Sequence, residues 1–205
     1  MQKDLLYQIA LTLIPNIGDV NAKALINHFG NAEAIFHASK KNLEAIEGIG
    51  SIRVNSIKNF KDFSRAEEEI SFIKKYKITP LFITDKNYPQ RLLNCYDSPP
   101  LLYYRGNADL NSSKMIAIVG TRNNGDYGKN ICEKLIADLA NEEVIITSGL
   151  AFGIDTVAHR ASIKNSIKTI GVLAHGLDRV YPSQNTPLAK QMLSCGGLLT
   201  EFKSG

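Results

Sequence analysis

The segment MIAIVGTRNNGDYGKNICEKLIADLANEEVIITSG, residues 115–149, decides the fold class of this chain. It opens with a continuous apolar run at 115–120 and passes through a glycine turn into a stretch with helical spacing at about 127–141. It ends in a second apolar run at 144–149. Parallel strands that helices cover on both faces are continuous apolar runs, whereas half-exposed strands alternate. The segment therefore predicts a strand, a helix and a second, parallel strand.

The same alternation continues to the end of the sequence. The pattern predicts a helix from about Asp155 to Lys164, a strand at 169–176, a helix from about Pro187 to Ser194 and a strand at 197–202. Repeated strand–helix units of this kind are typical of α/β domains with a parallel sheet. We therefore expect a Rossmann-like, doubly wound parallel sheet over residues 114–205.

The first part of the chain, residues 1–66, predicts a small all-α domain that is SAM-like. The pentapeptide IPNIG at 14–18 recurs as IEGIG at 46–50, each before a helix-forming stretch. The repeat resembles the helix-hairpin-helix motif, in which a tight turn leaves backbone N–H groups free for a phosphate. Asn16 stands where the second copy has Gly48, and asparagine tolerates a positive φ.

The second copy is followed by two basic residues, Arg53 and Lys58, which would suit a DNA contact. The alternative is that two helical hairpins only pack on each other as a compact cap, and we keep DNA contact here as a secondary hypothesis. Residues 67–113 are expected to hold a charged linking helix and a short β segment. Within it, Tyr103 and Tyr104 are interpreted as half-buried strand residues.

Composition places few limits on the partner of this protein. The net charge is +4, and Lys and Arg exceed Asp and Glu by 14 to 12 over residues 1–113 and by 10 to 8 over residues 114–205. No arm concentrates the charge, so a polyanion site must arise from local geometry. We find no membrane-length apolar run and no secretory signal in the sequence, which predicts a cytoplasmic protein without a membrane partner.

The glycine-rich turns after the predicted strands are the candidate site. Ligands of open parallel sheets bind outside the carboxyl ends of the strands, near the point where strand order reverses. Three such turns lie at 120–122, 148–153 and 175–179. Glycines allow close backbone approach, helix N-termini present free N–H groups, and Arg122 adds a planar donor. We therefore expect a phosphate site at this rim.

Known nucleotide-binding patterns are missing from the rim. The glycines at 120, 125 and 128 do not form G-x-G-x-x-G, and the second strand ends in Ser148 and Gly149, where a dinucleotide site has an acidic residue. The G-x-x-x-x-G-K-[ST] loop is also missing. We therefore expect no cofactor.

A metal site is also disfavoured by the sequence. Asp155 and His159 have the spacing of a metal pair or a proton relay, but helix capping and packing explain them better. The three cysteines are widely spaced and form no CxxC pair. We therefore expect no metal.

Four motifs in order identify the chain as similar to the DprA (Smf) family of DNA-processing proteins. They are MIAIVGTR at 115–122, SGLAFGIDTVAHRASI at 148–163, IGVLAHGLDRVYPSQN at 170–185 and GGLLTEF at 196–202. The resemblance implies sequence-independent binding and protection of single-stranded DNA, loading of the RecA recombinase during natural transformation, and no catalysis. It also implies DNA-binding or phosphate-binding roles for Gly120, Thr121, Arg122, Ser148, Gly149, Gly153, Arg160 and Arg179.

One difference from the family concerns the end of the sequence. The chain stops at Gly205, just after the last predicted strand, whereas family members continue with a basic Phe-x-x-Arg-Asn segment and further strands. The Rossmann-like domain is therefore expected to be truncated. A homodimer would form through regions that are partly missing here.

Two other function classes stay open on the sequence. Related Rossmann-like enzymes cleave N-glycosidic bonds of nucleotides with a P-G-G-x-G-T-x-x-E pattern. Only Gly196, Gly197, Thr200 and Glu201 faintly match it, and their spacing is wrong. The third class is a protein-interaction module, in which the rim glycines are structural and the helical part binds a partner.

Overall fold

The computed structural model describes residues 2–205. The chain divides into two compact units, one ending at Leu102 and the other running from Tyr103 to Gly205. The boundary lies within the strand β2 (Leu101–Gly106). The three-part division into 1–66, 67–113 and 114–205 stays a prediction.

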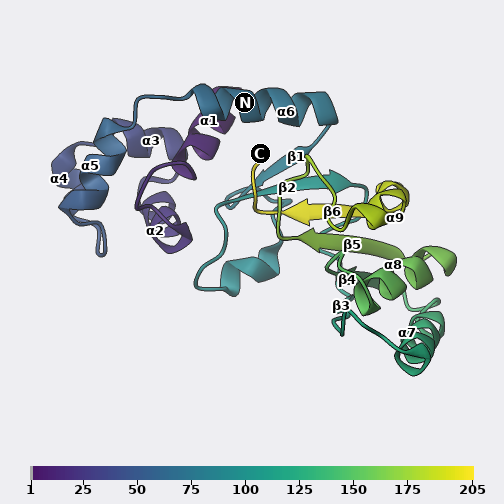
Figure 1. The fold of residues 1–205 in the computed structure, drawn as a ribbon. Coiled ribbons are helices and arrows are strands. Elements are labelled where there is room, and N and C mark those ends of the chain that lie inside the picture. The colour runs from purple at the N-terminus through teal and green to yellow at the C-terminus, as the bar shows by residue number, and fades with distance from the viewer. Residues whose placement is uncertain (1) are drawn as a thin grey trace. The chain divides into compact units, whose positions relative to one another are not determined.

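Six helices make up most of the first unit (Figure 1). Their buried side chains recur at helical spacing, as expected, with Ile9, Leu25, Ile35 and Ile57 almost without solvent exposure. A short 3-10 helix, η1 (Gln90–Asn94), follows later in the unit. The helices are α1 (Gln2–Leu11), α2 (Asp19–Phe29), α3 (Ala32–His37), α4 (Lys40–Glu44), α5 (Ser51–Asn59) and α6 (Ser64–Tyr76).

The two repeated turns have the same backbone geometry. Asn16 has a φ of 67° and Gly48 a φ of 81°. In the first turn the N–H of Ile17 donates to the Ile14 carbonyl at 3.2 Å, and the second turn repeats this bond at 3.0 Å. Asn16 can replace glycine because its short polar side chain tolerates the left-handed conformation. The expected internal repeat is confirmed.

The two basic residues after the second turn stabilise the helical unit. Arg53 donates from Nε to the Asn16 carbonyl at 3.2 Å and from Nη1 to the Gly48 carbonyl at 2.9 Å. Lys58 donates to two carbonyls at the end of α3, at 3.2 and 2.7 Å. Each cation therefore has internal acceptors, and Arg53 joins the two turns directly.

The strands form one six-stranded sheet in the order β1-β2-β6-β5-β4-β3. The four strands β3 to β6 are parallel, and β2 is antiparallel to β6. The register places Ile116 beside Ile146 and Ile146 beside Thr169. The remaining strands are β1 (Thr79–Phe82), β3 (Met115–Ala117), β4 (Ile145–Ser148), β5 (Lys168–Leu173) and β6 (Gly196–Thr200).

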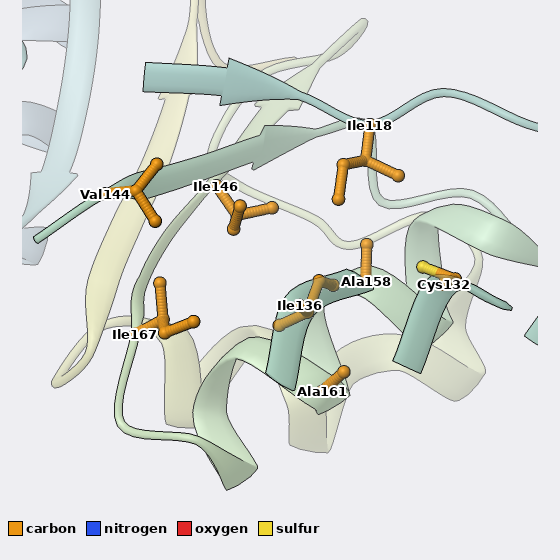
Figure 2. Close-up of a cluster of buried hydrophobic side chains, with 8 residues drawn as sticks. All are labelled: Ile118, Cys132, Ile136, Val144, Ile146, Ala158, Ala161 and Ile167. Atoms are coloured by element: carbon orange, nitrogen blue, oxygen red, sulfur yellow. The ribbon is translucent and has the colours of Figure 1, made fainter. Parts of the chain in front are cut away.

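Three helices of the second unit, α7 (Asp126–Asp138), α8 (Ile154–Lys164) and α9 (Thr186–Met192), connect the parallel strands. The strand order is sequential from β3 to β6, so right-handed crossovers place these helices on the same face of the sheet. On that face, Ile118 and Ile146 pack against Ile136 of α7 and Ala158 of α8 (Figure 2). This core holds the rim turns in place.

The opposite face of the sheet is partly open toward the carboxyl ends of the strands. Register places Ala117 and Val172 on this face, and both are exposed. Val119, which follows β3, has 85% of its surface exposed. Strand β3 is also shorter than the expected apolar run at 115–120. Residues 118–120 of that run lead into the rim turn and lie outside the strand.

Candidate nucleic-acid interface

Two glycine turns pack directly on each other at the carboxyl ends of β3 and β4. The N–H of Ile154 donates to the Thr121 carbonyl at 3.1 Å. Gly153 has a φ of 82°, and a Cβ there would lie 2.1 Å from the Thr121 oxygen. A Cβ on Gly120 would lie 2.6 Å from the side chain of Ile154. Glycine is therefore required at both positions by close approach.

A pocket of about 280 Å³ opens beside these turns. It contains polar and apolar groups from three successive strand ends, as the convergence of parallel strands predicts. The parallel strands do not reverse order between β3 and β6, so the pocket forms without a reversal among these strands. It is lined by Arg122, residues 149–152, Asp155, residues 172–175, Tyr181 and Pro182.

Arg122 is the cation of this pocket. Its side chain is exposed, and within the described part of the chain the guanidinium takes part in no hydrogen bond or ion pair. A planar guanidinium with free donors suits bidentate binding of a phosphate. Arg122 is therefore available to an anion that enters the pocket.

Ser148, which was predicted to be a rim ligand, and Asp155, which was predicted to cap its helix, both have structural roles. Ser148 is buried, and its hydroxyl donates to the Ile118 carbonyl at 2.7 Å. Asp155 lies in the first turn of α8, as expected, and its carboxylate accepts from the N–H of Ala151 at 3.4 Å. A Cβ on Gly149 would lie 2.5 Å from this carboxylate. An anion in the pocket would therefore avoid Asp155 and approach from the Arg122 side.

His159 is fully buried behind the same turn. Its Nε2 contacts the Gly149 carbonyl, and its Nδ1 lies 2.7 Å from the Thr169 hydroxyl. A carbonyl oxygen only accepts, so Nε2 carries a proton, and burial of the ring favours the neutral imidazole. Burial has the largest effect on the pKa of His159 and lowers it. The hydrogen bond to the Gly149 carbonyl and the negative charge of Asp155 act in the opposite direction and raise the pKa, but by less. The expected packing role of His159 is confirmed.

This buried histidine predicts a pH-dependent stability. Below its ordinary pKa of 6.5, the unfolded chain takes up a proton that the folded chain binds only at lower pH, so stability is lost as the pH falls. One such proton changes the free energy of unfolding by up to about 1.4 kcal/mol per pH unit. Urea unfolding from about pH 7.5 to about pH 5.5 should therefore show the stability difference between the parent and His159→Gln shrinking. A pH-independent difference would contradict the neutral, buried imidazole.

Two aromatic rings line the pocket beside Arg122. The backbone N–H of Tyr181 donates to Nε2 of His175 at 3.3 Å, which helps to fix this loop. Tyr181 has 73% of its surface exposed, and Phe152 has 45%. Phe152 was not predicted to be a site residue, although an apolar residue between Gly149 and Gly153 in a loop was a usable signal.

The loop that carries Tyr181 is held by a buried amide that the sequence did not single out. Asn185 is 2% exposed, and its Nδ2 donates to the Leu150 carbonyl at 2.9 Å and to Thr156 Oγ1 at 2.8 Å. The loops after β4 and β5 are thereby joined. Because buried amides need partners, this bond constrains the shape of the pocket.

The two arginines assigned with the family resemblance lie outside this pocket. Arg160 lies in a separate groove between α7 and α8. Arg179 follows β5, is exposed, and pairs with Asp178 at 3.3 Å. The structure therefore brings Gly120, Thr121, Arg122, Gly149 and Gly153 together, and places Arg160 and Arg179 elsewhere.

Residues 2–205 contain no group of three or more His, Cys, Asp or Glu side chains that could hold a metal ion. The three cysteines are free thiols. Over the same residues, every helix is too short or too polar to cross a bilayer.

Comparison with known proteins identifies several relatives. The Smf protein of Synechocystis sp. is 34% identical over 97% of this chain and 51% of its own length. A crystal structure of DNA processing protein A from Streptococcus pneumoniae matches with a TM-score of 0.79 and 29% identity, over 98% of this chain and 68% of that chain. A Helicobacter pylori DNA processing protein A structure, titled for its single-stranded DNA binding mode, matches with a TM-score of 0.53 and 28% identity. That match covers 63% of this chain and 57% of the other.

The chain spans about half the length of the curated relatives it matches. A helix-hairpin-helix family model matches residues 8–70, in agreement with the repeat found in the sequence. The model for DNA recombination-mediator protein A matches residues 79–205, which is more than half of the chain. The chain therefore belongs to the DNA recombination-mediator protein A family.

Proposed function

We propose that the rim pocket binds single-stranded DNA without sequence preference and protects it. One observation carries the proposal: Arg122, whose guanidinium has no partner among residues 2–205, lines the same pocket as the exposed residues Phe152 and Tyr181. Single-strand sites combine cations that contact the backbone with aromatic rings on which bases stack. In a duplex the base faces are already stacked on each other. Only an unpaired strand can therefore contact the cation with its backbone and stack its bases on the aromatic rings at the same time.

The related structures support this proposal. The Helicobacter pylori structure is titled for single-stranded DNA binding, and the Streptococcus pneumoniae relative is named a DNA processing protein. The Streptococcus pneumoniae crystal structure matches 98% of this chain, including the rim turns. We further propose that the protein acts in the cytoplasm during natural transformation, helps load RecA recombinase and forms a homodimer.

We propose that the protein is not an enzyme. The N-glycosidic alternative needs a carboxylate beside a phosphate loop, and Glu201 does not line the pocket. Asp155 does line it, but its carboxylate accepts a hydrogen bond from the Ala151 N–H. A carboxylate that orders the loop is poorly placed to act on a substrate.

Fluorescence anisotropy with an oligo-dT strand and a matched duplex, over a salt series, tests the proposal. We expect preference for the single strand, and a log affinity that falls with log salt by about 0.7 for each phosphate neutralised. Equal affinity for duplex, or independence of salt, would contradict it. A nucleotide-hydrolysis assay on the same protein should show no turnover, and release of a free base would favour the enzyme.

A further inference from the structure

A cationic surface other than the rim pocket lies on the helical side of the second unit, residues 103–205. A groove of about 380 Å³ lies between α7 and α8 and contains the cations Lys134, Arg160 and Lys164 with the single carboxylate Glu133. The rest of its lining is asparagine and alanine. The groove therefore has an excess of positive charge in a region where few apolar side chains are available.

The three cations are free to bind. Within the described residues none of them forms an ion pair or donates a side-chain hydrogen bond, and all three are exposed. Elsewhere in this unit a lysine with an acid in reach does pair, as Lys114 does with Glu142 at 2.9 Å. Glu133 is adjacent to Lys134 on α7, and neighbouring helix residues do not face each other. Like-charged groups without partners favour an anionic ligand.

The lining of the groove favours a phosphate chain over an acidic peptide. Amphipathic peptides bind in grooves through apolar anchors, and here the only apolar side chains are Ala137 and Ala161. Arg160 and Lys164 are four residues apart on α8, so they point from one face and are separated by about 6 Å along the helix axis. Such a row of cations suits a ligand with regularly repeated negative charges.

The groove is continuous in the fold with the rim pocket. Gly153 is the N-cap of helix α8 and packs on the Arg122 turn, and helix α7 begins four residues after Arg122. The two helices pack side by side from there (Figure 1). Arg160 lies only about 10 Å along the helix axis from Gly153. A strand held at the rim can therefore continue onto the groove.

We propose that the α7/α8 groove is a second phosphate-binding track that holds the continuation of the single strand bound at the rim. This inference rests on the proposed function of the rim pocket. Under this inference Arg160 binds DNA in the groove, whereas Arg122 binds it in the rim pocket. The rim provides the stacking contacts and the first phosphate contact, and the groove adds charge contacts that only longer strands can use.

The test compares two triple variants of the full chain. One removes the groove cations by Lys134→Ala, Arg160→Ala and Lys164→Ala. The control, Lys114→Ala with Lys168→Ala and Lys190→Ala, removes the same charge from exposed positions of the same unit. Each protein is titrated with a thymidine trinucleotide and with an oligo-dT of about 24 nucleotides, the latter longer than a typical single-strand site.

For the long strand, the groove variant should bind about tenfold or more weakly, and its salt slope should fall by about 2, as expected for three lost phosphate contacts. Binding of the trinucleotide should be unchanged, and the control variant should bind both ligands nearly as the parent does. Equal losses in the two triple variants, or no loss in either, would overturn the inference while leaving the rim function intact.

Two further outcomes separate a failure of the proposed rim function from a failure of the groove inference. If the parent binds neither oligonucleotide, the proposed rim function fails and the track fails with it. If polyglutamate binds to the parent through the groove cations while the long oligo-dT does not, the groove takes an acidic protein segment and the inference is wrong. Circular dichroism of each variant checks that it is folded like the parent.

Discussion

Gly153→Ala should lower the free energy of unfolding by about 2–6 kcal/mol, because a strained backbone costs about 1–3 kcal/mol and displacement of packed atoms costs about as much again. The φ of 82° is unfavourable for any residue with a Cβ. The new methyl group would also lie 2.1 Å from the Thr121 oxygen, so the two rim turns must separate. Urea unfolding of the two proteins measures the difference.

The matched control for this substitution is Gly128→Ala. Gly128 lies within α7, and the nearest atom to an added Cβ is an ordinary 3.7 Å away. Alanine is the better helix former by about 1 kcal/mol, so this variant should be as stable as the parent or slightly more stable. If Gly153→Ala and Gly128→Ala behaved alike, the close packing of the two turns would not be a constraint on the fold.

Arg122→Ala should weaken binding of single-stranded DNA by about 1.5–3 kcal/mol, the range for a hydrogen bond to a charged group. This corresponds to a loss of roughly tenfold to a hundredfold or more in affinity. The side chain is exposed and has no partner in the described part of the chain, so its removal should leave the stability nearly unchanged. Anisotropy titration and urea unfolding of the same sample separate the two effects.

Arg122→Lys should restore binding only in part, because an ammonium group cannot make the bidentate contact of a guanidinium. Lys190→Ala provides the control, since it removes one exposed charge from α9 in the same unit. It should bind DNA nearly as the parent does. An Arg122→Ala protein with parental affinity, or one that is unfolded, would remove Arg122 from the proposed site.

Hydrophobic patterning determined much of this fold before the structure was known. The parallel strands and the helices between them appear within a few residues of their expected positions, because side-chain periodicity is a local property of the sequence. The left-handed turn at Asn16 was predictable for the same reason, since it depends on the residue itself. The convergence of the rim turns also followed, because parallel strands bring their carboxyl ends to one edge.

The environment of each polar side chain was decided by tertiary structure. Ser148 looked like a phosphate ligand but donates to a carbonyl of the neighbouring strand. The Asp155 carboxylate accepts a hydrogen bond from a loop N–H. Arg53 donates to carbonyls of two turns that are far apart in the sequence. Which donors are left for a ligand depends on acceptors that only folding brings near.

Arg160 shows the same limit most clearly. The motif at 148–163 places it in sequence beside the rim glycines, yet the direction of its side chain on α8 puts it in a different groove. The sequence by itself determined the elements, their order and the rim at which they meet, because these depend on local periodicity and chain connectivity. Only the tertiary structure decided which cations share a surface, because that depends on how the helices pack and on which partners their side chains find there.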